Sequence, residues 1–563
     1  MKRLFAFFLC CLLLTGCGRK SIPEASFPAT TGPDTESSPV TAITEPAATG
    51  AAPEIPYHSR FDAETIITLS DDGILVDTLD SGADEDAVAV THDIIYYEDR
   101  EAYDSGNPYG EGTPKERHTA EEAAAHTVVN ITQPGAYRIN GKLSAGQIRV
   151  DLGENAYEDE NAVVELILQN ADITCTVAPA ILFLNTYECD GNWSAEEAKP
   201  DVDTSAAGAN LILEGNNIVS GSHVAKIYKD KDGEKKLWKQ DGAIYSYMSM
   251  NVFGPGSLEL TADNEGLDTE LHLTINGGNL TIRSDNDGIN TNEDGVSVTT
   301  INGGSVRIAA GLGAEGDGID SNGYLVINGG TVISAANPAA DAGLDSDLGS
   351  YIHGGTVIAM GSAMDWAESD SNQVTMNLQF AQQQKAGSKI TITTTEGTES
   401  ICFDTAGTHA RNFTGLILSH PGFVQGATYH VYVDDLQQQY TGTDVSQFGP
   451  GGMMPPEGFG EGNFPAPPDG MPFPQDSFGG GPGKGGQVPD GEMPQGPDGM
   501  TPPGGFGGMV PPEGFEGPEF PSGQGPQNFD GQAPGEEPAA TPRIQFYMND
   551  KVNAFSGVET IRE

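Results

Sequence analysis

Positive charge is scarce in this chain. Lysine and arginine together number 27, against 81 aspartates and glutamates, which leaves a formal net charge of −54. Nucleic acid and anionic membrane surfaces would repel such a chain, so neither is expected as a partner, whereas divalent cations would be attracted. Of the six cysteines, only Cys175, Cys189 and Cys402 follow the first 17 residues. Three thiols cannot build a disulfide framework, so buried, unpaired thiols are expected.

Long apolar runs are also missing beyond the first residues. The chain begins MKRLFAFFLCCLLLTGCGRK, in which two basic residues precede a short apolar core, as in a secretory signal. Residues 14–17, Leu-Thr-Gly-Cys, look like a bacterial lipobox. This likeness implies cleavage before Cys17, lipidation of its thiol and a lipid-anchored location on the extracellular face of the cell membrane. No later run of 18 apolar residues exists, so we expect membrane contact through the lipid anchor only.

A four-residue motif recurs four times. It reads Ile-Asn-Gly-Gly at 275–278, 301–304 and 327–330, and Ile-His-Gly-Gly at 352–355, with spacings of 26, 26 and 25 residues. Each copy follows a triplet of Gly, then Leu or Ile, then Asp or Asn, at 266–268, 288–290, 318–320 and 343–345. Two features that recur together at a fixed period are typical of a repeat architecture, in which each unit stacks on the next.

Apolar residues alternate after each Gly-Gly pair, as Leu280 and Ile282 do, which predicts strands with one buried side. A unit of about 25 residues cannot bury that side alone, but stacked units share a continuous core. Nearly equal spacing places equivalent strands in parallel, so we predict an all-β fold, a right-handed parallel β-helix. The glycines are expected at corners with positive φ. One polar position of the motif is expected to form a ladder along the stack, through Asn276, Asn302 and Asn328.

Composition divides the chain into seven regions. The segment rich in Ser, Thr and Pro near the start has little to bury, and the Gly/Pro-rich segment near the end cannot form a packed core and is expected to be disordered. One short stretch, 119–126, is helical in pattern. Outward-facing Ile333 and Ile358 are expected to be covered by the C-terminal strands. The predicted regions are a signal peptide at 1–16, a flexible tether at 17–60, an N-terminal β region with an insertion at 61–135, the β-helix at 136–365, a small C-terminal β unit at 366–440, the low-complexity Gly/Pro-rich arm at 441–541 and a terminal β-hairpin at 542–563.

Several segments together resemble a known family. They are GAYRINGKL at 135–143 with GQIRVDL, then VVELILQNADIT, APAILFLN, DGAIYS, GPGSLELTA and the DGI…INGG series. Over roughly residues 61–435, the series resembles the clostridial calcium-binding β-helix family of carbohydrate-binding lipoproteins, whose fold is that of pectate lyases. The resemblance implies Ca²⁺ as cofactor and binding of acidic or neutral plant polysaccharide, such as pectic acid or cellulose. The chain departs from the family in an insertion at about 91–126 and in AADAGLD at 339–345, where Asp341 is displaced by one residue.

Acidic side chains keep phase with the repeat. At strand spacing, equivalent residues of successive units would lie about 4.8 Å apart. Two carboxylates at that distance repel by ~3.5 kcal/mol at an effective dielectric of about 20, so a cation would be needed to bridge them. Hard oxygen ligands favour calcium over transition metals. The alternative is that the side chains form local Asx-turns in water and need no metal. The predicted ligands are Asp268, Asn290, Asp320 and Asp345 in one column and Glu265, Asp287, Asp317 and Asp341 in a second.

Outward-facing aromatic and basic residues are candidate sugar contacts. Tyr324 and Tyr351 have the same parity in adjacent units, and flat exposed rings suit the apolar faces of pyranose sugars. Arg283 and Arg307 also point outward and could hold a uronate carboxylate through two parallel hydrogen bonds. Trp366 directly follows the last unit. The alternative is that each is an ordinary surface residue.

Three classes of function fit these features. The preferred interpretation is a non-catalytic cell-surface lipoprotein that binds plant or cell-wall polysaccharide, acidic pectic or cellulosic, through a calcium-stabilised β-helix. The second is a calcium-dependent pectate or polygalacturonate lyase, which would need a base such as Arg283 or Arg307. The third is a structural adhesin of the cell envelope whose Gly/Pro-rich arm makes the contacts. Fold alone does not indicate chemistry, so catalysis is the less favoured alternative.

Overall fold

The structure is a computed structural model, and almost all of its regular elements are β-strands. The described helices are the short α2 (Ala120–Ala124), inside the stretch predicted to be helical and capped by Thr119 and Glu122, and the 3₁₀ turn η1 (Ala156–Glu158). No described helix is long and apolar enough to cross a membrane. Cys17 and nearly all of the predicted arm lie outside the described residues, which are 55–78, 87–97, 116–192, 194–231, 234–362, 365–397, 400–407, 410–443 and 542–561.

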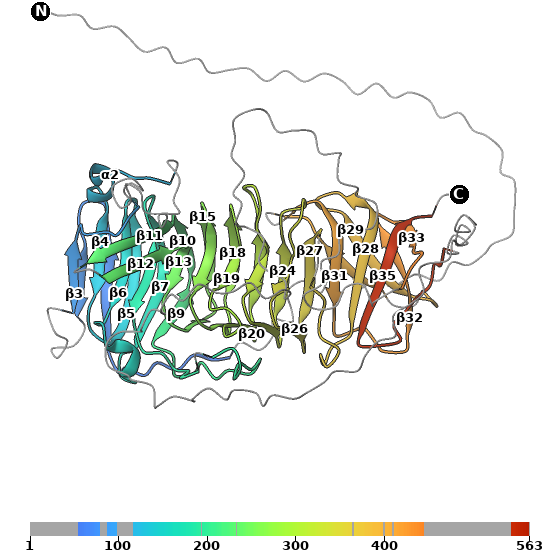
Figure 1. Ribbon diagram of the computed structural model, residues 1–563, viewed down its shortest axis with the longest axis horizontal. Helices are drawn as coiled ribbons and strands as arrows, with labels where there is room; N and C mark the ends of the chain where they lie inside the picture. Colours follow the sequence, from blue (N-terminus) through green and yellow to red (C-terminus); the bar gives the residue numbers. More distant parts are fainter. Residues whose placement is uncertain are drawn as a thin grey trace, which may run out of the picture. The chain divides into compact units, whose positions relative to one another are not determined.

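The repeat region contains three ladders of parallel strands, and the chain passes once through each ladder per repeat (Figure 1). Ladder 1 comprises β9 (Ala209–Glu214), β14 (Met250–Phe253), β17 (Leu273–Ile275), β20 (Val298–Ile301), β23 (Tyr324–Ile327) and β26 (Gly349–Ile352). Ladder 2 comprises β7 (Val164–Thr174), β10 (Asn216–Gly221), β15 (Ser257–Ala262), β18 (Asn279–Ser284), β21 (Ser305–Ala309), β24 (Thr331–Ala335) and β27 (Thr356–Gly361). Ladder 3 comprises β4 (Thr127–Ile131), β6 (Gly146–Asp151), β8 (Ile181–Asn185), β13 (Gly242–Ser246), β16 (Glu265–Thr269), β19 (Ile289–Thr291), β22 (Ile319–Ser321) and β25 (Asp345–Ser346).

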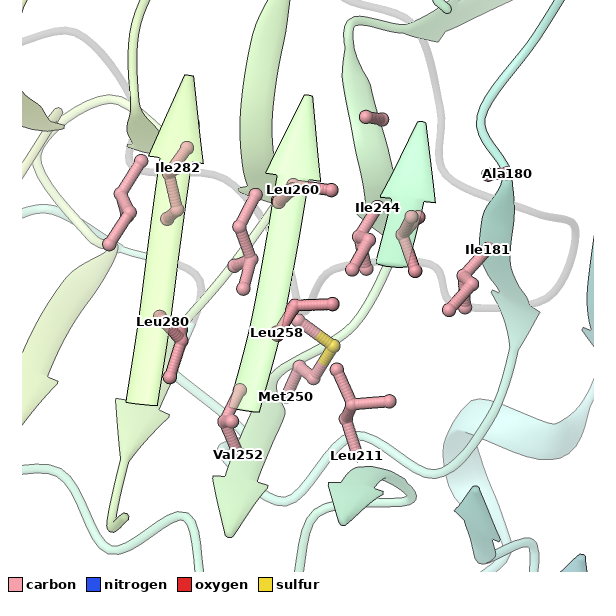
Figure 2. Packing of buried hydrophobic residues seen from close by; sticks show 14 of the residues in the cluster. Ala180, Ile181, Leu211, Ile244, Met250, Val252, Leu258, Leu260, Leu280 and Ile282 are labelled. Carbon is pink, nitrogen blue, oxygen red and sulfur yellow. The ribbon is translucent and has the colours of Figure 1, made fainter. Parts of the chain in front are cut away.

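The core lies between the three ladders. Figure 2 shows side chains from all of them pointing toward one another, with Ile244 from ladder 3, Met250 from ladder 1 and Leu260 from ladder 2. Leu280 and Ile282, predicted to face inward, are fully buried. Because each repeat adds its apolar side chains to the same interior, the stack stabilises units that could not fold alone.

The Asn-Gly-Gly motif makes the corner between ladders 1 and 2, as expected. Its second glycine has a positive φ in every copy, for example +78° at Gly304. A Cβ at Gly304 would lie 2.5 Å from the carbonyl oxygen of Gly278 in the preceding repeat, so only glycine fits there. The predicted asparagine ladder is present, since the Asn302 amide nitrogen donates to Asn276 Oδ1 and the Asn328 amide nitrogen donates to Asn302 Oδ1, both at 2.8 Å.

Eight further strands form the C-terminal part. β31 (Phe413–Ser419) pairs antiparallel with β27 and with β28 (Thr375–Gln384), and β29 (Lys389–Thr394) pairs with β30 (Ser400–Asp404) and β32 (Thr428–Val433). Ile333 and Ile358 are only 6% and 3% exposed and pack in the core of this unit, which confirms that its strands cover them.

The terminal segment differs from the predicted hairpin at 542–563. Its strands do not pair with each other: β34 (Phe546–Tyr547) pairs with β32, whereas β35 (Val552–Thr560) pairs in parallel with β28 and antiparallel with β33 (Leu436–Gln439). Phe546 and Phe555 are buried, with ring centroids 4.9 Å apart. Because an isolated hairpin buries too little, filling this core is the more stable arrangement.

The remaining strands lie before the repeats or beside them. β1 (Glu64–Leu69) pairs in parallel with β5 (Gly135–Leu143) and antiparallel with β2 (Leu75–Thr78), β3 (Val88–Thr91) pairs with β4, and β11 (Val224–Lys231) pairs with β12 (Glu234–Gln240). The predicted tether already contacts the sheet at its end, since Ser59 and the Arg60 backbone donate to the Glu165 carboxylate at 2.6 and 2.7 Å. Cys175, Cys189 and Cys402 are unpaired, as expected, but only Cys175 is buried, and the other two are half-buried.

Candidate functional site

Ladder 3 aligns the first column of predicted ligands. In register, Asp268 of β16 pairs with Asn290 of β19, Asn290 with Asp320 of β22, and Asp320 with Asp345 of β25. Asp268 and Asn290 are buried, whereas Asp320 and Asp345 are half-buried. The alignment agrees with the repeat spacing, because each repeat contributes one short strand to this ladder.

Three carboxylates come together at the first repeat of this column. Oxygen atoms of Asp241, Glu265 and Asp268 lie within 4.8 Å of one another, and both Glu265 and Asp268 are buried. Two buried oxygens have no hydrogen-bond partner: Oδ2 of Asp268, within this cluster, and Oδ1 of Asn290, its neighbour in the column. Unsatisfied buried oxygens are costly. The cluster therefore has oxygen atoms to offer to a cation.

The second predicted column connects neighbouring repeats. Asp287 Oδ1 accepts the backbone N–H of Asp317 at 2.6 Å, and Asp317 Oδ1 accepts that of Ala342 at 2.5 Å. The displaced Asp341 instead accepts the N–H of Gly316 at 2.9 Å. Glu265 of this column belongs to the cluster at Asp241, whereas Asp287, Asp317 and Asp341 form no such cluster in the described part of the chain. Their bonds run from one repeat to the next, which differs from the local Asx-turn alternative.

Stacking shifts the pKa of most of these acids upward. Burial, followed by repulsion from neighbouring carboxylates, raises the pKa of Asp268, Asp287 and Asp317 well above the usual range. The same two causes raise the pKa of Asp320 to about 8, with Asp345 as the largest charged contributor. Full ionisation of the column is therefore costly unless a proton or a cation compensates.

Lys239 lies beside the acid cluster, and sequence reasoning missed it. Its Nζ lies 2.9 Å from Asp241 Oδ2 and donates to Asn292 Oδ1 at 2.7 Å. Burial lowers its pKa, but the nearby carboxylates, Asp241 foremost, raise the pKa by more, so the ammonium keeps its proton. Lys239 precedes the first Asp-Gly step, and nothing in the repeat pattern points to it.

Two further acids were also missed. Asp241 could have been found, since Asp241-Gly242 is the same Asp-Gly step that precedes β19 and β22. Asp365 extends the column beyond Asp345, since its Oδ2 accepts the N–H of Ser346 at 3.1 Å. Burial and then the charge of Asp345 raise the pKa of Asp365 to about 7. Its position after the last repeat gave no periodic signal.

The predicted sugar-stacking tyrosines are brought together. Tyr324 pairs with Gly349 and Tyr351 with Val326, so the two rings are offset by two positions on adjacent strands of ladder 1. Their centroids lie 6.1 Å apart at 51°, and both side chains are half-buried. His353, which was not predicted, continues the row, with its ring 5.9 Å from that of Tyr351. Trp366 is half-buried.

The two predicted arginines lie on adjacent strands of ladder 2, at half-buried positions outside the core. Arg283 pairs with Ala309 and Arg307 with Thr281, so they are also offset by two positions. Arg411, from the C-terminal unit, was not predicted. It donates to the carbonyl oxygens of Ala310 and Gly311 at 2.8 and 2.7 Å. Burial and then the positive charge of Arg283 lower the pKa of Arg411, so two like charges are close together here.

A family model described as carbohydrate-binding domain-containing protein matches residues 125–415, more than half of the 563 residues. The chain belongs to this family. The predicted metal ligands and the predicted sugar-contacting residues all lie within the matched span, and so do Lys239 and Arg411. Strands β34 and β35 lie beyond it.

A curated relative and a solved structure are also similar. The relative is a carbohydrate-binding domain-containing protein of Acetivibrio thermocellus, 32% identical over 157 residues, which are 28% of this chain and 45% of the relative. The chain therefore matches less than half the length of that relative. The solved structure is titled as the polysaccharide lyase-like protein from C. thermocellum, gadolinium derivative. It is 21% identical, with a TM-score of 0.31, over 52% of this chain and 92% of that chain.

Proposed function

We propose that this chain is a cell-surface lipoprotein that binds polysaccharide, acidic pectic or cellulosic, through a right-handed parallel β-helix stabilised by calcium. Membership of the carbohydrate-binding domain family supports the polysaccharide partner. The three parallel ladders, each visited once per repeat, support the β-helix, and the handedness follows the general preference of parallel strand connections. Lipidation at Cys17 would hold the protein on the extracellular face of the membrane.

The buried acid column is the observation that carries the calcium proposal. Carboxylate and amide oxygens are the donors calcium prefers, and the orphaned Asp268 Oδ2 and Asn290 Oδ1 fit such an ion. Calcium would supply positive charge to the column and join successive repeats. Asp241, Glu265, Asp268 and Asn290 would hold one ion. The acids farther along the stack would hold others: Asp287, Asp317, Asp320, Asp341 and Asp345.

The arginines of ladder 2, together with Arg411 of the C-terminal unit, favour an acidic chain among the ligands. Arg283, Arg307 and Arg411 concentrate positive charge on one part of a strongly acidic protein. A uronate carboxylate would relieve the repulsion between Arg283 and Arg411 and accept paired guanidinium hydrogen bonds. Tyr324 and Tyr351 would contact sugar rings whatever their charge.

A lyase is the second candidate, because Lys239 adds a basic residue beside the proposed calcium ligands. A base that removes the proton next to a uronate carboxylate must be unprotonated. The Lys239 ammonium instead contacts Asp241 at 2.9 Å and donates to Asn292 at 2.7 Å within the acid cluster, and this favours the binding function over the lyase.

The test is binding of polygalacturonate and of a neutral glucan, with and without EGTA, while the absorbance of unsaturated uronates is followed. We expect binding of both polymers and no rise in absorbance. Arg307→Ala should remove roughly 1–3 kcal/mol of the preference for polygalacturonate, the scale of a charged hydrogen bond. Added salt should weaken that preference, because exposed charges are screened over about 10 Å.

Two variants complete this test. Tyr324→Ala should weaken the binding of both polymers, because the contact between the tyrosine ring and a sugar ring does not depend on the charge of the sugar. Lys385→Ala, which removes an exposed charge elsewhere in the C-terminal unit, is the control for net charge. Failure of the wild type to bind any polysaccharide would contradict the binding function, and a rise in absorbance would establish the lyase.

A further inference from the structure

A shallow cavity of about 370 Å³, largely open to solvent, lies between the last repeat and the C-terminal unit. Four segments line it: the corner after β26, the connection to β28, the turn between β31 and β32, and the start of β35. Its lining includes His353, Asn372, Gln373, Phe423, Val424 and Lys551. The volume is within the usual range for pockets that bind small ligands.

The walls of this cavity are held by internal contacts. Phe423 is buried, with its ring centroid 5.6 Å from that of Tyr429 and 6.1 Å from that of Phe403. Lys551, which also lines the cavity, donates from Nζ to the Asn372 carbonyl oxygen at 2.7 Å. A site fixed in this way needs little reorganisation to receive a ligand.

His353 connects the cavity to the aromatic row on ladder 1. It occupies the position of asparagine in the other three copies of the motif, so this repeat departs from the pattern where the cavity begins. Its ring adjoins Tyr351, whose ring in turn adjoins Tyr324. The His353 Nδ1 atom accepts the backbone N–H of Asn372 at 3.2 Å, so the neutral imidazole carries its hydrogen on Nε2.

We propose that this cavity binds one neutral sugar ring of a polysaccharide whose adjoining rings lie on Tyr351 and Tyr324. The proposal rests on the polysaccharide-binding function and adds a site to it. Val424, which is 57% exposed, offers an apolar surface to the face of a sugar ring, beside the buried Phe423. The imidazole N–H, the Asn372 side-chain amide and the Gln373 side-chain oxygen offer hydrogen bonds to hydroxyl groups, whereas the Gln373 amide nitrogen already donates to Gly355 and Ser419 at 2.8 Å.

Charge around the cavity favours a neutral sugar over a uronate. Lys551 contributes one positive charge to the lining. Beside the adjoining Tyr351 lie Asp370 and Glu368, whose negative charges, after burial, raise the pKa of that tyrosine. A uronate carboxylate would meet no net positive charge here, in contrast to the arginines of ladder 2. The molecule would thus have two carbohydrate surfaces of different selectivity.

The experiment compares affinities for cellohexaose and hexagalacturonate by titration calorimetry. His353→Asn restores the residue of the other three repeats and so should fold normally. Val424→Trp should fill the cavity mouth. In each variant, we expect the dissociation constant for cellohexaose to rise about tenfold relative to that for hexagalacturonate, which is the scale for removing an aromatic anchor. Leu436→Trp is the matched control, since Leu436 is 56% exposed in the same unit and is not part of the lining.

The outcomes separate the two proposals. If the wild type binds and both variants keep the wild-type ratio, the cavity site is overturned while the binding function stands. If Leu436→Trp moves the ratio as far as Val424→Trp, the cavity site is also overturned, because an added ring anywhere on the unit would then have the same effect. If the wild type binds neither oligosaccharide, the binding function itself is contradicted.

Discussion

The two halves of ladder 3 share one continuous column of paired residues but differ in charge chemistry. Along a single column of paired residues, the early repeats carry Asn130, Arg149, Leu182 and Tyr245. The later repeats carry Asp268, Asn290, Asp320 and Asp345 at the same register position. The strands are parallel throughout, so the difference lies in the side chains alone.

The early half neutralises its own charge. The Arg149 side chain is only 8% exposed, and its guanidinium donates to Asn130 Oδ1 at 3.0 Å and to both carboxylate oxygens of Asp93 at 3.1 and 3.2 Å. In the later half, no lysine or arginine occurs between Lys239 and Asp365 apart from Arg283 and Arg307, which lie on ladder 2. The parallel ladder therefore does not itself require a cation. The proposed calcium requirement concerns only the acids of the later repeats.

Calcium removal should produce the largest difference between the two halves. At free calcium 100 times the dissociation constant, a bound ion adds about 2.7 kcal/mol to the free energy of unfolding, which EGTA would remove. Hydrogen exchange should accelerate in β16, β19 and β22 and stay unchanged in β4 and β6. Equal acceleration in both halves, or a melting temperature that EGTA does not move, would contradict the calcium proposal.

A charge change within the column should further distinguish the later repeats from the early ones. In EGTA, Asp320→Asn should raise the free energy of unfolding by about 1 kcal/mol, because it removes repulsion from Asp345 and its neighbours. With calcium present, the same change should lower the free energy of unfolding, because a ligand is lost. Asn130→Asp is the control in the early half, where an added acid beside Arg149 should give no calcium dependence. If the free energy of unfolding changes in the same direction with calcium and in EGTA, Asp320 does not bind calcium.

The smallest expected effect concerns an ion pair in the early repeats, where charged side chains are paired with one another. His223 Nδ1 lies 2.9 Å from Asp263 Oδ1, and its Nε2 lies 3.4 Å from Glu116 Oε1. Burial lowers the pKa of His223, but the two carboxylates raise it by more, to about 10 from a usual 6.5. Its stabilising contribution should therefore be complete below pH 6.5 and be lost as pH rises through about 10.

His223→Gln should accordingly lower the free energy of unfolding by about 1 kcal/mol at pH 6, since Asp263 is half-exposed and screening weakens the pair. The penalty should vanish above pH 10 in urea unfolding curves, and the exposed His58→Gln should show no such trend. An equal penalty at both pH values would mean that His223 contributes packing and no charge.

The repeat and its acids could be predicted because their signals are periodic. Gly278, Gly304 and Gly330 recur where the corner needs a positive φ, and the alternation around Leu280 marks the buried side. The same period aligned Asp268 with Asn290 and Asp320. Asp241 was missed although its Asp-Gly step fits the pattern. The prediction of a terminal hairpin was wrong, because whether these two strands pair with each other or with distant strands depends on the rest of the fold.

The sequence by itself determined the period of the repeat, the side of each strand that is buried and the column in which the acids stack. Each of these depends on spacing along the chain, which a strand ladder converts directly into position. Only the tertiary structure brought Lys239 to the acid cluster, Arg411 to Arg283, and Lys551 to the cavity beside His353. Lys551 is 179 residues from Asn372, whose carbonyl oxygen it binds, and no periodic pattern relates them. Such contacts arise where separate units pack, so their partners are set by the surfaces that meet.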